Sequence, residues 1–325
     1  MGIRNNPFAM YVNALSNEGF ELLGHAVAER RCFDRIGFRN YTEIVEAYRD
    51  VRPCPSCESD EYMKNGKTPA GHQRYVCRKC GLQYSALSGT IFEHSKKDLA
   101  DWVDFVTMMC HNVQVEAAAD MCGLSHRTAF EWRHRVLATV NKYQEQTVLK
   151  KRIWIDEAYV ADSSLLSQPD WKPKRGLSKN KICIVVAIDV FKNPYAVICG
   201  HGKPSAKRIK DALLGHIQEG SVIVHDMEKS HKSLVKAVKG IDEPYKADTK
   251  DPEYLKGMKM VNNLCAWLKY YLGRFPGMKQ DNLQHYLNWF VYLFRVTRDK
   301  EKWPKVERVL RHLAMSDTTF RSKWT

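Results

Sequence analysis

The spacing of apolar residues changes several times along the chain and divides it into helical and strand-like segments. Residues 1–50 and 96–143 carry apolar side chains at helical spacing. The continuous apolar runs at 153–155 and 182–188, and the run at 221–225 with its apolar centre, predict buried strands. Helical spacing returns after residue 253. Residues 51–92 consist of short alternating runs rich in Cys, Gly, Arg and aromatic residues, which predict the hairpin strands of a small domain. The pattern predicts an α+β protein of several domains.

Ten cysteines occur in the chain, and four of them have the spacing of a metal site. Cys54 and Cys57 form one Cys-x-x-Cys pair, and Cys77 and Cys80 form a second pair after 19 intervening residues. Four thiolates are a set that structural zinc prefers, and they leave no open position for a substrate water. A redox pair or ordinary buried cysteines would not explain two matched pairs in a stretch this poor in apolar residues. We predict a zinc ribbon at 51–95 that holds one structural Zn²⁺ ion.

The net charge of the chain narrows the class of partner. The 51 Lys and Arg residues exceed the 37 Asp and Glu residues by 14, and this excess favours a polyanion, because each cation placed on a phosphate releases condensed counterions. No stretch approaches the apolar length of a spanning helix, and the first residues lack the apolar run of a signal peptide. We therefore expect an intracellular protein that binds nucleic acid and no membrane.

A helix-turn-helix is predicted between residues 96 and 148. Helical spacing from residue 115 ends at Gly123, and Ser125 then stands where a second helix would take its N-cap. In such a motif the start of the second helix meets the major groove of DNA. An ordinary helical pair is the alternative, but the neighbouring ribbon and the basic composition favour DNA recognition.

The candidate DNA-binding residues are basic or polar side chains in three segments. Those of the ribbon and of the second helix would contact phosphates and base edges, and those of a basic loop at 163–180 lie between two predicted strands. They are Arg74, Arg78 and Lys79 in the ribbon, His126, Arg127 and Arg133 in the helix, and Lys174 and Arg175 in the loop.

Three oxygen-bearing side chains occupy places where strands and a helix can bring them together. Asp156 and Asp226 each follow a predicted buried strand, and Asn262 lies on a predicted helix that carries Lys269 seven positions later. Seven positions are about two helical turns, so Asn262 and Lys269 share a face. Phosphoryl transfer by two divalent ions needs oxygen ligands from separate elements that converge on one point. The pattern indicates this chemistry.

Each of these residues also has a structural interpretation when it is taken alone. Aspartates after strands are commonly turn residues or helix caps, and Asn262 could be a cap. Glu157 adjoins the first aspartate but would point to the opposite face of an extended strand, so it would not bind the same ions. His225 and His231 flank the second aspartate and could tune it, although a core or surface role is more common for a single His. The ordered set favours the functional interpretation.

The order of these residues resembles that of bacterial insertion-sequence transposases of the DDE superfamily. The chain is most similar to the branch that has an N-terminal zinc ribbon and Asn in place of the third acidic residue. The resemblance covers about residues 50–295. In the predicted catalytic domain it rests on Asp156, Asp226, Asn262 and Lys269, on segment 174–179 before the second strand, and on segments 273–277 and 286–290 after the Lys. In the ribbon it rests on Cys80, Gly81 and 88–92.

The resemblance implies a fold, a reaction and a role for each residue. It implies an RNase H-like mixed-sheet catalytic domain in which Asp156, Asp226 and Asn262 bind Mg²⁺ or Mn²⁺ and Lys269 contacts the scissile region. The implied substrate is double-stranded DNA, both transposon ends and target, bound by a homo-oligomer in the bacterial cytoplasm at the nucleoid. Where relatives usually have His and Ser between the Asn and the Lys, this chain has Cys265 and Ala266.

The sequence therefore predicts five segments. They are a helical lead-in at 1–50, the zinc ribbon at 51–95, a helix-turn-helix region at 96–148, the catalytic domain at 149–295 and a basic helical tail at 296–325. Two other functions stay open: a domesticated, non-catalytic DNA-binding regulator, and a nuclease that cuts without strand transfer. Retention of both aspartates argues against the regulator.

Overall fold

The structure is a computed structural model of the 325-residue chain, and it describes residues 8–48, 53–68, 72–162, 180–276, 278–298 and 304–317. The chain divides into two compact units. The first comprises 1–111, 116–132 and 303–325, and the second comprises 112–115 and 133–302. None of the described helices is both long and apolar enough to cross a membrane.

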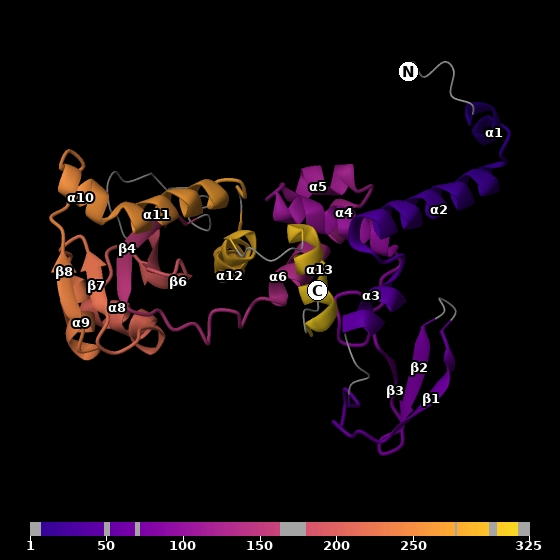
Figure 1. The fold of residues 1–325 in the computed structure, drawn as a ribbon, viewed down its shortest axis with the longest axis horizontal. Helices are drawn as coiled ribbons and strands as arrows, with labels where there is room; N and C mark the ends of the chain where they lie inside the picture. The colour runs from indigo at the N-terminus through magenta and orange to yellow at the C-terminus, as the bar shows by residue number, and fades with distance from the viewer. Residues whose placement is uncertain are drawn as a thin grey trace. The chain divides into compact units, whose positions relative to one another are not determined.

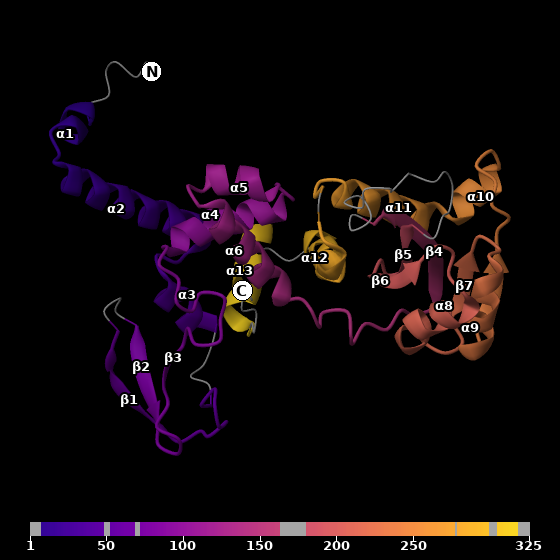
Figure 2. The ribbon, with the colours of Figure 1, turned by 180° about the vertical axis from the view of Figure 1, so that it is seen from behind.

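The first unit begins with helices and a small sheet. The helices are α1 (Ala9–Asn13), α2 (Asn17–Ile36) and α3 (Tyr41–Tyr48). The sheet consists of β1 (Tyr62–Lys67), β2 (Gln73–Cys77) and β3 (Gln83–Ser85), which pair antiparallel in that order (Figure 2). Its small core contains Tyr75 and Tyr84 together with the first and third of the four ribbon cysteines. A core this small needs a further constraint to be stable.

Three helices of the predicted helix-turn-helix region follow the ribbon. They are α4 (Leu99–Cys110), α5 (Val115–Met121) and α6 (His126–Ala138). Gly123 has a φ of +59°, which favours glycine, and the Ser125 hydroxyl accepts a hydrogen bond of 3.1 Å from the backbone N–H of Thr128. The predicted turn and N-cap are therefore present. The indoles of Trp102 and Trp132 stack at 3.7 Å and fix the middle of α6 against α4.

The last helix, α13 (Lys305–Met315), belongs to this first unit instead of forming a separate tail. It packs on α3 and α4 and buries Val309, Leu310 and Leu313. The helical spacing of its apolar residues can be seen in the sequence, but the two helices on which it packs cannot be predicted from that spacing.

The second unit contains a five-stranded mixed sheet. Its strands are β4 (Arg152–Ala161), β5 (Lys181–Asp189), β6 (Pro194–His201), β7 (Val222–His225) and β8 (Ile241–Pro244). The order across the sheet is β6-β5-β4-β7-β8, with β5 antiparallel to its neighbours and β7 and β8 parallel to β4 (Figure 1). A meander of three strands followed by two parallel crossover strands in this order is the RNase H-like topology that the sequence predicted.

Helices cover both faces of this sheet. They are α8 (Ala206–Leu213), η2 (Leu214–His216), η3 (Lys229–His231), α9 (Lys232–Ala237), α10 (Pro252–Gly257), α11 (Lys259–Leu272) and α12 (Gln280–Arg298). Ile153 and Ile155 of β4 pack in one core with Ile209 of α8 and Leu234 of α9. Helix α11 packs on β4 and β5, and the Trp154 indole donates to the backbone at the end of α10. Odd-numbered β4 residues thus face α8 and α9, and even-numbered residues face α11.

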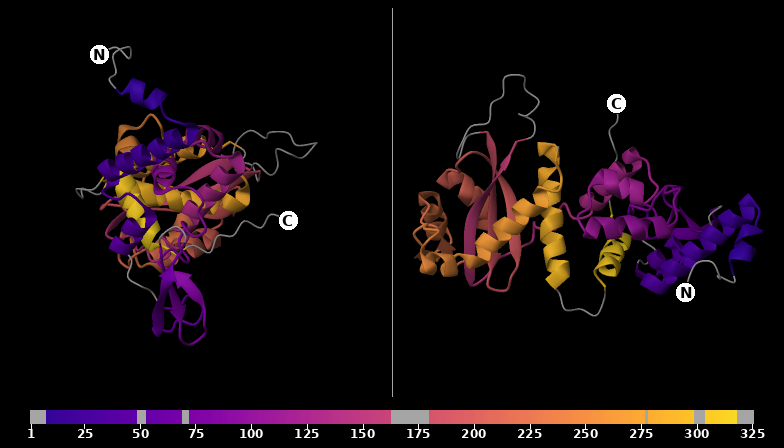
Figure 3. Two further views of the ribbon diagram at one scale, coloured as in Figure 1. Left: turned by 90° about the vertical axis from the view of Figure 1, so that its right-hand side faces the viewer. Right: turned by 90° about the horizontal axis from the view of Figure 1, so that it is seen from above.

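The edge strand β6 is closed by side-chain amides. The Gln144 amide donates to the carbonyl of Ala196 at 3.0 Å and accepts from its N–H at 2.9 Å. Gln284 of α12 accepts from the N–H of Ile198 at 3.1 Å, and α12 lies beside this end of the sheet (Figure 3). These bonds occupy backbone groups that an exposed edge would offer to another strand.

Candidate functional site

Two carboxylates lie at one level of the central parallel strands. In the register of β4 and β7, Trp154 pairs with Val224, so Asp156 and Asp226, each two positions further on, come side by side. Asp226 directly follows β7, as predicted. Asp156 does not follow a strand: β4 continues to Ala161 because its pairing with β5 extends that far.

Helix α11 adds the amide and a thiol above the same point. Asn262 is half-buried in the first turns of α11, and its side chain shares a hydrogen bond with the Tyr254 phenol of α10. Burial raises the pKa of Tyr254, and the nearby charges of Asp156 and Asp226 raise it further, so the phenol lies near both carboxylates. The Cys265 Sγ lies 3.9 Å from Oδ2 of Asp156. Cys265 therefore lies beside the carboxylate of Asp156.

The electrostatics of this cluster favour a cation. Burial raises the pKa of Asp156 to about 6, and the neighbouring charges of Glu157 and Asp226 also raise it, although the backbone N–H of Glu157 opposes the shift. Two crowded carboxylates and an amide carbonyl are hard oxygen donors of the kind that Mg²⁺ and Mn²⁺ accept. These residues fit the divalent ions that the family resemblance implies.

Two lysines lie near the carboxylates. Lys269 is exposed on α11, and its charge lowers the pKa of Cys265 against the dominant effect of burial. Lys203 pairs with Glu228 at 2.7 Å, and Glu157 and Asp226 add to the rise in its pKa. Both lysines therefore contribute positive charge near the acidic side chains.

The opposite face of β4 carries a second set of polar side chains. Glu157 points away from Asp156, as strand alternation predicted, and its Oε1 accepts from Nε2 of His231 at 2.9 Å. The Nε2 of His225 donates to Oδ1 of Asp242 at 2.8 Å. The sequence interpretation treated both histidines only as neighbours of Asp226, because it could not pair them with carboxylates on other elements.

The four cysteines of the predicted ribbon converge. The Sγ atoms of Cys54 and Cys80 are 3.4 Å apart, those of Cys57 and Cys77 are 3.6 Å apart, and all four lie within 4.8 Å of one another. Backbone N–H groups at Cys80 and Lys79 lower the pKa of Cys77 to about 6. A stabilised thiolate among four sulfurs at the end of a hairpin fits one tetrahedral zinc ion.

Comparison with known proteins agrees with this geometry. Residues 52–81 match the family model for the InsA N-terminal domain. The match includes both cysteine pairs, so this segment resembles the InsA-type zinc ribbon. The chain is also 24% identical over 253 residues to an uncharacterized protein in transposable element ISH50 of Halobacterium salinarum, covering 73% of this chain and 83% of the relative.

Solved structures show looser similarity. A chain of a simian T-cell lymphotropic virus intasome gives a TM-score of 0.29 at 12% identity, covering 57% of this chain and 67% of that one. A chain of the Mos1 transposase paired-end complex with the left transposon end gives 0.23 at 14% identity, covering 60% and 75%. The fold class therefore follows from the strand order and not from these superpositions.

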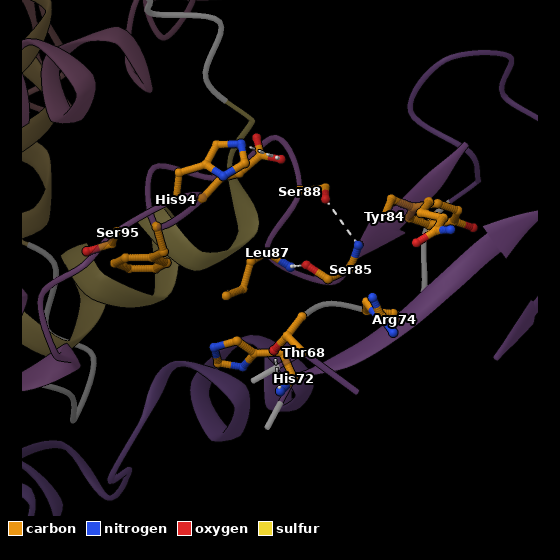
Figure 4. Close-up of a pocket in the computed structure, with 12 residues that line it drawn as sticks. Thr68, His72, Arg74, Tyr84, Ser85, Leu87, Ser88, His94 and Ser95 are labelled. Carbon is orange, nitrogen blue, oxygen red and sulfur yellow. Dashed lines mark hydrogen bonds and ion pairs between the residues drawn. The ribbon is translucent and has the colours of Figure 1, made fainter. Parts of the chain in front are cut away.

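The predicted DNA-contacting residues of the InsA-type ribbon have different surroundings. Arg78 and Lys79 are exposed between the last two cysteines. Arg74 is half-buried and lines a cavity of about 420 Å³ with His72, Ser85 and other residues of the first unit (Figure 4). The Nε of Arg74 is buried without a hydrogen-bond partner among the described residues. A phosphate oxygen entering this cavity would satisfy it.

The predicted DNA-contacting residues of α6 also differ from one another in exposure. His126 and Arg127 are exposed at the start of α6, where a recognition helix meets DNA. Arg133 is only 2% exposed, donates to the carbonyl of Val113 and lies over the ring of Phe275. The prediction that Arg133 contacts DNA is therefore wrong, because about two helical turns past the exposed start its side chain enters the core. Lys174 and Arg175 lie outside the described residues.

Proposed function

We propose that this chain is the transposase of an insertion sequence, an enzyme that binds the ends of its element and catalyses DNA cleavage and strand transfer. The observation that carries the proposal is that Asp156 of β4 and Asp226, just after β7, lie level on an RNase H-like sheet, with Asn262 of the covering helix α11 near them. The InsA-type ribbon and the relative in a transposable element support it.

In this proposal the two aspartates and the amide of Asn262 would hold the divalent ions. Bound Mg²⁺ or Mn²⁺ would supply charge stabilisation to the attacking and leaving oxygens of the phosphoryl group. The chain itself fixes its ligands: β4 and β7 set the two carboxylates at one level, and Tyr254 orients the amide of Asn262. Lys269 would hold the DNA backbone beside the scissile phosphate.

Recognition of double-stranded DNA is assigned to the ribbon and to α6. Arg78, Lys79 and Arg127 are exposed and would bind phosphates, while His126 would reach base edges from the first turn of the helix. An element has two ends to be joined to one target, so we expect at least two copies of the chain on the DNA.

The test is Mg²⁺-dependent joining of a pre-cut element end to plasmid DNA. Asp156→Asn and Asp226→Asn preserve side-chain shape but remove a charged ligand, so joining should fall by about a thousandfold or more, since metal ions supply several kcal/mol of charge stabilisation. End binding, measured by mobility shift, should be nearly unchanged because the basic contacts remain.

Asp211→Asn is the matched control, because Asp211 is an exposed carboxylate on α8 of the same unit. It should join DNA like the original chain. Full joining by Asp226→Asn would show that the second carboxylate is another residue. End binding without any joining by the original chain would instead support a non-catalytic regulator.

A further inference from the structure

Two buried histidines each have one ring nitrogen without a hydrogen-bond partner among the described residues. The side chains of His225 and His231 are both 0% exposed, and the Nδ1 atom of each has no hydrogen-bond partner among the described residues. Their rings lie nearly perpendicular with centroids 5.0 Å apart. An unsatisfied buried polar atom costs free energy, and two at one place call for an explanation.

The hydrogen bonds at the other ring nitrogens determine what Nδ1 can do. Each Nε2 contacts a carboxylate, Asp242 for His225 and Glu157 for His231, and a carboxylate accepts, so Nε2 carries the proton. In a neutral ring the Nδ1 atom then offers its lone pair. A carboxylate that holds the far nitrogen of a histidine is the arrangement that orients metal-bound histidines and raises their basicity.

A third ligand comes from Asp226. One ligand atom each from His225, Asp226 and His231 lie within 4.8 Å of one another, and Nδ1 of His231 is 3.9 Å from Oδ1 of Asp226. Two atoms bound to one zinc ion at about 2.1 Å can be at most about 4.2 Å apart. A small closing movement of these side chains would therefore complete a first coordination sphere.

We propose that His225, His231 and Asp226 form a second metal site, for a borderline transition ion such as Zn²⁺, on the α9 side of the sheet. Imidazole nitrogens select such ions over Mg²⁺, and three protein ligands leave a fourth position for water. The local charge fits a cation, because Asp156, Glu157 and Asp226 lie close together and the nearby Lys203 is paired with Glu228 at 2.7 Å. The ion joins η3 to the end of β7 and fixes the carboxylate of Asp226.

This site does not depend on the proposed transposase activity, although the two share Asp226. Its two histidines pair with Glu157 and Asp242, away from Asp156 and Asn262, so substitution of the histidines separates the two sites. Loss of DNA joining in Asp156→Asn leaves all three proposed zinc ligands in place, so the metal content of the histidine site can be measured independently. Absence of the second zinc from the original chain would not contradict the proposed joining reaction.

The experiment measures zinc in the full-length chain. Elemental analysis after dialysis should find two Zn²⁺ per chain, one from the four cysteines and one from the histidine site. Titration of the second equivalent against a chromophoric chelator then gives its affinity. His225→Asn with His231→Asn should retain one equivalent, and His201→Asn should retain two. His201 is the matched control, because its Nε2 also contacts a carboxylate, Asp162, at 2.8 Å.

Asp242→Asn provides a variant that is expected to fold, since the Asp242 side chain is 42% exposed. It should weaken the second zinc by about 10- to 100-fold, as loss of an outer carboxylate does. A single equivalent in the original chain would overturn the proposal and make His231 a protonated bridge between Glu157 and Asp226. Retention of the second zinc in the double variant, or its displacement by millimolar Mg²⁺, would also overturn it.

Discussion

Adjacent acidic residues on β4 have different surroundings because successive side chains of a strand face opposite ways. Asp156 faces α11 and lies beside Cys265 and Asp226, whereas Glu157 is buried against His231. The sequence was sufficient to separate these two roles, since the alternation needs only the strand. It could not reveal that Glu157 has a partner 74 positions away, because no local spacing encodes that contact.

The amide at Asn262 makes a prediction about metal affinity. Asn262→Asp adds a third carboxylate to a place where crowding already raises the pKa of Asp156. In zinc-loaded protein without Mg²⁺ the variant should melt at a lower temperature, and added Mg²⁺ should raise its melting temperature more than it does for the original chain. Asn263→Asp, the exposed neighbour on α11, is the control. Equal Mg²⁺ responses in all three proteins would contradict a ligand role for Asn262.

At the scale of elements, the sheet shows how an edge strand is closed without another strand. Gln144 lies in the connection between α6 and β4, yet its amide pairs with β6 in the manner of a neighbouring backbone. The amide also donates to Asn288 of α12 at 2.7 Å. A polar residue in a connection is typically interpreted as a surface residue, so the role of Gln144 at the edge of the sheet could not be predicted from the spacing of apolar and polar residues.

Gln144→Leu should therefore destabilise the second unit. The substitution keeps the volume but leaves the N–H and C=O of Ala196 with fewer partners in a buried place, which costs about 1–3 kcal/mol for each unsatisfied group. The measurement is chemical denaturation followed by a probe in this unit. Gln146→Leu, two positions away and exposed, should change the midpoint little. Equal midpoints for the two variants would show that the amide contributes no net stability.

Helix α6 gives a pH-dependent prediction through His134. Burial lowers the pKa of His134 to about 4, with smaller contributions from the charges of His285 and Arg133. An unfolded His titrates near 6.5, so the unfolded state binds the extra proton between about pH 6.5 and 4. Stability should be full above this window and fall as the pH decreases through it, by an amount on the order of 3 kcal/mol.

The measurement is the melting temperature from pH 7 to pH 4 for the original chain and for His134→Phe. Other groups contribute the same slope to both proteins, so the difference between the two curves reports His134 alone. Loss of a hydrogen bond in the variant would shift its whole curve without changing that slope. Parallel curves over the entire range would contradict a depressed pKa.

At the scale of the whole molecule, the features that could be predicted from the sequence are those set by residues close together in the chain. The two cysteine pairs, Gly123 and Ser125 act within a few positions, so their spacing was sufficient to predict the ribbon and the turn. The strand order also followed from the resemblance. The packing of α13 on α4 and the burial of Arg133 depend on contacts between distant segments, and helical periodicity does not identify the partner of a face.

If the DNA-contacting cations lie in the first unit, the salt dependence of DNA binding should respond to substitutions there and not to substitutions in the second unit. If exposed cations of the ribbon neutralise DNA phosphates, the logarithm of the binding constant should fall linearly with the logarithm of salt concentration, by about 0.9 for each phosphate contacted. Replacing both Arg78 and Lys79 with Ala should reduce that slope by about two and weaken binding to element ends and random duplexes alike. Lys236→Ala, an exposed lysine on α9 of the other unit, should leave the slope unchanged. A slope that is unaffected by loss of both ribbon cations would place the phosphate contacts elsewhere on the chain.

His126→Ala should behave differently, because a side chain at base edges contributes to sequence discrimination. It should narrow the difference in affinity between element ends and random DNA while keeping the slope.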